Sequence, residues 1–238
     1  MPLQTVEPQR LYRQIAEQLR QLIAGGEFAV GTRLPAEREL ALQLGVSRPS
    51  VREALIALEV EGTIEVRTGS GIYVQSPAPR SAPVVSTDVQ DDWGPLEVMS
   101  ARVLVEAEVA ALAAGQAKTA DLRQMRYALE RMRKQAARGE TPREGDEAFH
   151  EAIARACGNG VLLDTVQRYW QARNGSLFER LGDYFENPQS WQFAIAEHEQ
   201  VLLAIEAHNA GAARRAMQKH LRQAHKRYSA SWHRTATR

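Results

Sequence analysis

Four residues in the second half of the sequence have the side chains and the spacing of a divalent-metal site. Asp146 and His150 stand four positions apart in a segment of helical periodicity, so both side chains project from one helix face. His198 and His220 lie in two later segments of the same kind. Neutral imidazoles suit zinc, nickel or iron, and the carboxylate supplies negative charge. The sequence therefore predicts a metal site in a helical core; the alternative is four separate packed or surface side chains.

The elements that must position these residues are helices. From Leu96 onward apolar residues recur at helical spacing, and no segment alternates as a strand does. The predicted helices are 96–115, 120–137, 144–157, 160–170, 191–207 and 212–232. Thr119, Asn159 and Asn209 are the expected N-caps, and Asn187-Pro188 is an expected break. Short connections make neighbours antiparallel, so we predict an all-α bundle of about six helices.

The N-terminal third has a different pattern. After a first predicted helix at 11–24, two short helical segments flank Gly45, and Ser47 is the expected N-cap of the second. Period-two segments at 64–66 and 72–74 then surround a glycine-containing turn, which indicates a hairpin. Together these elements predict a winged helix-turn-helix, whose second helix offers Arg48, Ser50 and Arg52 to the DNA major groove. The alternative for these arginines is an ordinary solvated helix face.

A change of composition predicts the domain boundary. Serine and proline are frequent between 76 and 95, which is typical of a linker. The expected organisation is a DNA-binding domain at 1–75, a linker at 76–95, and a metal-binding, effector-binding and dimerisation domain at 96–233. The fold class is therefore mainly α, with the winged domain preceding the all-α bundle.

Composition limits the other possibilities. The chain has 238 residues, a formal net charge of +1 and one cysteine, Cys157, which excludes an internal disulfide and fits a reducing cytosol. No segment is long and apolar enough to cross a membrane, and the N-terminus lacks an apolar signal core. We expect a soluble cytoplasmic protein without membrane partners. With so little net charge, DNA affinity must depend on a few well-placed arginines, doubled by formation of a homodimer.

Three runs in the first third, PAERELA, GVSRPSVREAL and RTGSGIYV, resemble the GntR family of bacterial transcription regulators. The resemblance implies that Arg38, Arg48 and Arg52 contact operator DNA. It also places Ser50 beside them and Gly69 at the tip of the wing, near the minor groove.

Further runs, DEAFHEAIARACGN, EHEQVLLAIEAHN and AMQKHL, resemble the FCD-type effector domain of the FadR subfamily. This resemblance implies that the metal ligands are Asp146, His150, His198 and His220. It also implies that Arg102, four residues before Glu106, binds an effector carboxylate; the alternative is a helix-surface salt bridge with Glu106. Arg173 is a second candidate. The runs PLEVMSARVLVEAEVAALAA and YWQARNGS are similar to the hexuronate-responsive members.

The sequence as a whole therefore predicts a transcription regulator, expected to be a repressor. Its homodimer binds double-stranded operator DNA, and a small organic acid such as a hexuronate controls that binding from a zinc or nickel site. Two alternatives stay open at this stage. One is a metal-dependent enzyme acting on a small carboxylate, and the other is a DNA-binding dimer that responds to no effector.

Overall fold

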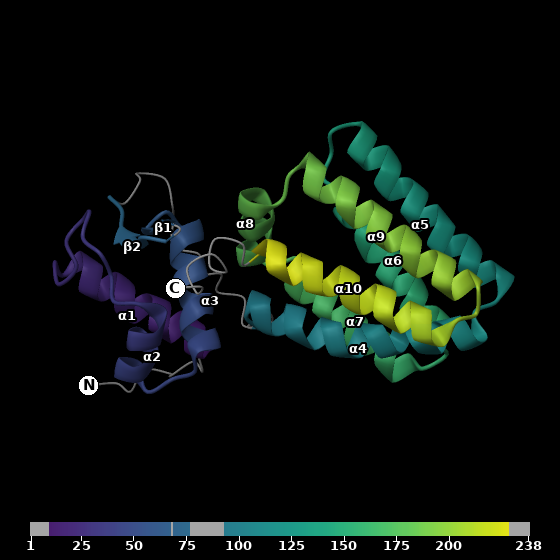
Figure 1. Cartoon of the computed structure of the whole chain (residues 1–238), viewed down its shortest axis with the longest axis horizontal. Coiled ribbons are helices and arrows are strands. Elements are labelled where there is room, and N and C mark those ends of the chain that lie inside the picture. Colours follow the sequence, from purple (N-terminus) through teal and green to yellow (C-terminus); the bar gives the residue numbers. More distant parts are fainter. Residues whose placement is uncertain (1–9, 68, 77–92, 229–238) are drawn as a thin grey trace, which may run out of the picture. The chain divides into compact units, whose positions relative to one another are not determined.

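The computed structural model describes residues 10–67, 69–76 and 93–228, which form two compact units with separate cores (Figure 1). The division falls after Leu96, so that the second unit runs from Glu97 to Tyr228. Most of the predicted linker and residues 229–233 of the predicted second domain lie outside the described residues. None of the described helices is long and apolar enough to span a membrane.

The first unit is a winged helix-turn-helix, as predicted. It comprises α1 (Leu11–Ala24), α2 (Glu37–Leu44), α3 (Arg48–Val60), β1 (Ile64–Arg67) and β2 (Gly71–Val74). Gly45, with a φ of 65°, makes the left-handed turn between α2 and α3. Ser47 caps α3 by accepting a hydrogen bond from the Ser50 amide at 3.3 Å. The strands pair antiparallel, with Ile64 opposite Val74. The apolar face of α3 supplies the fully buried residues Ala54, Leu55 and Leu58.

The second unit is an all-α bundle, also as predicted. Its helices are α4 (Pro95–Gln116), α5 (Thr119–Ala137), α6 (Arg143–Ala156), α7 (Gly160–Arg173), α8 (Ser176–Phe185), α9 (Pro188–Glu206) and α10 (Ala210–Tyr228). Helix α5 packs against α6 and α9, and α10 packs along α9 (Figure 1). Phe149 on α6, Val166 on α7 and Val201 on α9 are fully buried, so these helices share one core.

Helix α8 was not predicted. It has only 10 residues and includes Gly182, and so short a helix is marginal without tertiary contacts. The bundle provides those contacts, because α8 packs against α7 and α10.

Two predicted helix boundaries were wrong. Thr119 is the first residue of α5 and not its cap; the Asp121 carboxylate accepts a hydrogen bond from the Lys118 amide at 2.8 Å instead. The predicted break at Asn187-Pro188 does separate α8 from α9, but α9 begins at Pro188 and not at 191, because a proline in the first turn needs no amide donor. Asn159 and Asn209 do cap α7 and α10, as predicted.

The cap of α9 gives a test of this boundary. The Asn187 side chain accepts a hydrogen bond from the Ser190 amide at 2.9 Å, so Asn187→Ala should lower the free energy of unfolding by about 1 kcal/mol. Urea denaturation followed by circular dichroism measures this loss. Asn174→Ala, just beyond the C-terminus of α7, is the matched control. Equal stability of the two variants would contradict the assignment of the cap.

Candidate metal centre and nucleic-acid interface

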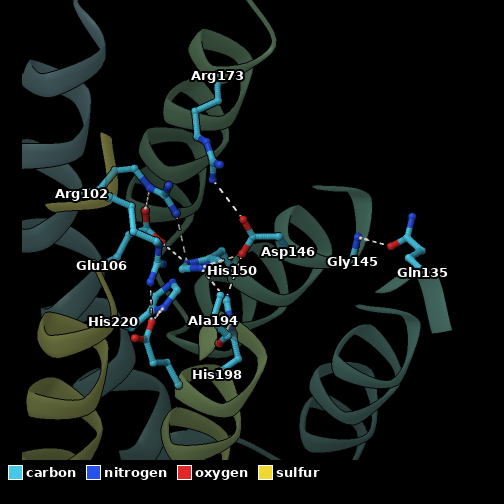
Figure 2. A network of polar contacts seen from close by, with 12 residues as sticks. Arg102, Glu106, Gln135, Gly145, Asp146, His150, Arg173, Ala194, His198 and His220 are labelled. Carbon is cyan, nitrogen blue, oxygen red and sulfur yellow. Dashed lines mark hydrogen bonds and ion pairs between the residues drawn. The ribbon is translucent and has the colours of Figure 1, made fainter. Parts of the chain in front are cut away.

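The structure brings the four predicted metal ligands together in the bundle. Asp146 and His150 stand one turn apart on α6, while His198 comes from α9 and His220 from α10 (Figure 2). One ligand atom from each of the four side chains lies within 4.8 Å of the others, and all four residues are buried. Three helices therefore place one carboxylate and three imidazoles around a single point.

Each histidine is held through its Nδ1 atom. The acceptors are the Glu106 carboxylate for His150, the Ala194 carbonyl at 2.6 Å for His198 and the Glu197 carboxylate at 2.9 Å for His220. Because ionised carboxylate and carbonyl oxygens only accept hydrogen bonds, the proton of a neutral ring stays on Nδ1. In a neutral ring the lone pair is then on Nε2, which faces the centre, and this is the usual arrangement of histidine ligands of a metal.

The surroundings of Asp146 fit a cation at this point. Its Oδ1 atom lies 2.9 Å from Nε2 of His198 and 3.5 Å from Nε2 of His150. Despite these short distances, Oδ1 is buried and makes no hydrogen bond of acceptable geometry within the described part of the chain. Lone pairs on oxygen and nitrogen repel one another unless a positive charge lies between them. The donor set therefore fits a divalent metal ion.

Burial and neighbouring charges set the protonation of the cluster. Burial lowers the pKa of His198, and burial with the two other imidazoles lowers the pKa of His220 well below its ordinary value. Burial opposes ionisation of Asp146, but His150, His198 and Arg173 outweigh it, so the pKa of Asp146 lies well below its usual range. Near pH 7 the cluster therefore has an ionised carboxylate and two neutral rings.

The third ring, His150, differs in its protonation. Burial acts to lower its pKa, but Glu106 and Asp146 outweigh burial and raise it. Burial alone would also raise the pKa of Glu106, yet Arg102 and His150 lower it to about 2. The Glu106 carboxylate is therefore ionised, and a metal ion must compete with a proton for His150.

Both candidate effector-binding arginines lie beside the cluster. The guanidinium carbons of Arg102 and Arg173 stand 4.6 Å and 4.3 Å from the centre of the Trp170 ring. Arg102 makes the expected pair with Glu106, at 2.5 Å, but the pair is buried and not on the helix surface. Arg173 donates to Asp146 at 3.1 Å and to the Tyr228 hydroxyl at 3.4 Å.

Arg102 and Arg173 line a cavity of about 30 Å³ together with three of the predicted ligands, Asp146, His198 and His220. The sequence did not predict the roles of Trp170, Tyr228 or Glu197. Trp170 is three positions before Arg173 on α7, so that contact follows helical spacing. Tyr228 and Glu197 are brought to the site by packing between helices, which no spacing along the chain indicates.

The predicted DNA-contacting residues lie on α2, α3 and the wing. Arg38 and Gly69 are exposed, and Ser50 is half-buried, with its hydroxyl 2.8 Å from that of Ser47. Nε of Arg48 and Nε of Arg52 lie 2.9 Å and 2.7 Å from the two oxygens of a single carboxylate, that of Glu37.

Nothing in the sequence pattern singles out Glu37 from the other acids of the first unit. In the structure it fixes the two recognition-helix arginines relative to each other and to the start of α2. A carboxylate that holds two guanidinium groups limits their rotamers.

A winged helix-turn-helix places its second helix in the DNA major groove, so the first unit has the fold of a DNA-binding domain. The family description "Bacterial regulatory proteins, gntR family" matches residues 11–74, and "FCD domain" matches residues 97–223. The chain belongs to the GntR family and is a DNA-binding transcription regulator, not an enzyme.

Similar proteins agree with this assignment. The Uxu operon transcriptional regulator of Escherichia coli is 37% identical over 217 residues, which cover 90% of this chain and 84% of the relative. The Exu regulon transcriptional regulator of Escherichia coli is 36% identical over 226 residues, which cover 92% and 84%. A solved structure of Lar, which controls the expression of the Listeria monocytogenes agr system, has a TM-score of 0.51 at 16% identity. The matched region covers 94% of this chain and 99% of the Lar chain, and this similarity supports the fold alone.

The DNA interface gives a direct test. Arg48→Ala and Arg52→Ala should each weaken specific operator binding by about 1–3 kcal/mol if the arginine reads a base edge. Folding should survive, because the side chains are 56% and 23% exposed and the other arginine still pairs with Glu37. Gel shifts with an operator selected from random DNA measure the loss.

The control is Arg214→Ala, which removes an exposed arginine paired with Glu108 in the bundle. Parental affinity in both recognition-helix variants would contradict the assignment of α3 as the reading helix.

Proposed function

We propose that a small organic acid, bound at a metal ion in the bundle, controls operator binding by this regulator. The ligands are Asp146, His150, His198 and His220, and the metal is zinc or nickel. The observation that carries the proposal is the convergence of these four donors with every Nδ1 atom already engaged.

The chemistry of the ligand set supports an acid as the effector. Four protein ligands leave two positions on a six-coordinate ion such as nickel, and a carboxylate with a neighbouring hydroxyl can occupy both. On zinc the same acid would raise the coordination number above four. When bound, the metal supplies a Lewis-acid anchor for such an anion. The chain itself supplies the charge and the hydrogen-bond donors around it.

Arg102 is suited to bind the same carboxylate. Its Nε atom donates to Glu106, whereas its Nη atoms have only weak partners, the Met99 sulfur at 3.7 Å and Nδ1 of His150 at 3.5 Å. Since Nδ1 of His150 already faces Glu106, it is a poor acceptor for the guanidinium. The Nη donors of Arg102 are therefore available to an anion in the cavity. Arg173 is the second choice, because its Nη atoms already contact Asp146 and Tyr228.

The relatives support the choice of acid. They are named for the Uxu operon and the Exu regulon, which agrees with the resemblance to hexuronate-responsive regulators. A hexuronate carries a carboxylate next to a ring oxygen and several hydroxyls, so it can satisfy the metal and Arg102 together. We therefore propose a hexuronate-like sugar acid as the effector.

The response also requires two states with different affinities for the acid. We propose that a homodimer presents two winged units to a palindromic operator. We also propose that the acid favours the state in which the spacing of the two winged units does not match the spacing of the operator half-sites. The result is release from DNA, as expected of a repressor that is lifted by its effector.

The metal proposal is tested by removing ligands. His150→Ala and His198→Ala should abolish stoichiometric metal in elemental analysis, because each loses one of four donors. Chelation should lower the melting temperature of the parent, because the metal ties three helices together. His208→Ala is the control, since this ring contacts the Ala114 carbonyl outside the cluster. Full metal content in both ligand variants would show that any metal is held elsewhere.

The effector proposal is tested by Arg102→Lys. Lysine keeps a positive charge beside the buried Glu106 but cannot present two parallel donors. The variant should retain its metal and its operator affinity, yet need about tenfold more D-glucuronate for release from DNA. Arg126→Lys, an exposed arginine paired with Glu206, is the matched control. If D-glucuronate released the Arg102 variant from DNA at the same concentration as the parent, another group would have to bind the carboxylate of the acid. Arg173 would be the next residue to test.

A further inference from the structure

The small cavity at the candidate metal centre adjoins a larger cleft. The cavity, of about 30 Å³, is lined by Asp146, His198 and His220 among others. The cleft, of about 580 Å³, lies beside α5, α9 and the turn between α8 and α9. Of the described residues, Glu186 and Trp191 are the two that line both spaces. These two side chains therefore stand between the cleft and the cavity.

Each of these two residues has a buried polar atom without a hydrogen-bond partner among the described residues. Neither Oε2 of Glu186 nor Nε1 of Trp191 makes a hydrogen bond within the described part of the chain, and Trp191 is only 7% exposed. Buried polar groups in folded proteins are nearly always paired, so an unpaired acceptor and an unpaired donor beside one cavity indicate a ligand that can serve both. A hydroxyl group does so, because it both donates and accepts.

Contacts on the other side fix the position of Glu186. Its Oε1 atom accepts a hydrogen bond from the Tyr228 hydroxyl. Burial is the largest cause that raises the pKa of Tyr228, so the phenol stays protonated and remains a donor. The same hydroxyl lies 3.4 Å from Nη2 of Arg173, whose Nη1 lies 3.1 Å from Asp146. Glu186, which lines the cavity, is therefore held in place by a chain of contacts that begins at a candidate metal ligand.

The size of the cavity excludes a large ligand from the inner space. One water needs about 10–15 Å³ measured in this way, so about 30 Å³ holds roughly two waters. A sugar acid anchored at the metal centre must therefore extend out of this space. Ser190 and Arg227 separate the cavity from a second cleft, of about 840 Å³, but the unpaired polar atoms belong to Glu186 and Trp191, so the acid is placed between these two residues. Its distal hydroxyls would then meet the two unpaired atoms. A second carboxylate at the same place would be repelled by Glu186.

We infer that Glu186 and Trp191 form a gate: an acid that passes between them must hydrogen-bond both side chains through its hydroxyl groups. This requirement makes the site selective for a polyhydroxylated monocarboxylate over a short hydroxy acid or a dicarboxylate. The inference rests on the proposed function, namely that an acid is anchored at the metal centre. It adds the residues that determine which acid is accepted.

The test is calorimetric titration of the metal-loaded, full-length protein with three acids. D-glucuronate reaches the gate with hydroxyls, L-malate reaches towards it with a second carboxylate, and L-lactate is too short to reach it. The parent should bind D-glucuronate most tightly. Glu186→Gln and Trp191→Phe should each weaken D-glucuronate binding about tenfold, the effect of one hydrogen bond to a buried group. Both variants should change L-lactate binding less than about twofold, and Glu186→Gln should bind L-malate more tightly than the parent does.

Glu140→Gln is the matched control, because Glu140 lines the same cleft but pairs with Arg138 away from the cavity. It should behave as the parent with all three acids. Thermal unfolding and metal content identify a misfolded variant. If Glu186→Gln or Trp191→Phe is misfolded, the acid affinities of the other variant decide the test.

An unchanged ratio of D-glucuronate to L-lactate affinity in the folded variants would contradict the role of Glu186 and Trp191 in selectivity. The proposal that an acid is anchored at the metal would still stand. If the metal-loaded parent bound none of the three acids, the proposed function would fail and the gate with it.

Discussion

The bundle depends on one electrostatic constraint: a carboxylate and three imidazoles face one another in a buried space. Oxygen and nitrogen lone pairs at 2.9–3.5 Å repel unless a proton or a metal ion lies between them. Burial makes the constraint severe, because water cannot screen charges there. The surrounding groups, Glu106, Glu197, the Ala194 carbonyl and Arg173, all hold the cluster in a form that leaves four donors directed at one point.

The helices supply that geometry in a simple way. One turn of α6 carries two of the donors, and the neighbouring helices α9 and α10 each add one. Because the donors come from three helices, any ion bound there connects elements that are far apart in the sequence. The same helices carry the walls of the cavity, so the fit of a ligand is coupled to helix packing. Such coupling is what a bistable regulator requires, provided that the ligand distinguishes two packings.

Much of this could be predicted from the sequence. The spacing of Asp146 and His150 fixes a shared helix face, and the glycine and cap at Gly45 and Ser47 fix the helix-turn-helix, because both signals are local. Helix α8 was missed although Leu177, Leu181 and Phe185 recur at helical spacing, because a segment of 10 residues with a glycine is marginal without its contacts to α7 and α10. Contacts across helices were also beyond sequence reasoning. Glu37 looked like one acid among many, and nothing along the chain indicates that Glu186 and Trp191 share a wall.

The central claim is that a metal ion bound by three imidazoles and one carboxylate anchors a carboxylate effector. X-ray absorption spectroscopy of the zinc-loaded protein tests it most directly, with and without D-glucuronate. The account predicts scattering from about three imidazoles at roughly 2.0–2.1 Å together with oxygen ligands. Adding the acid should change the oxygen shell while the imidazole signal stays. A spectrum without imidazole scattering, or one that the acid leaves unchanged, would contradict the account.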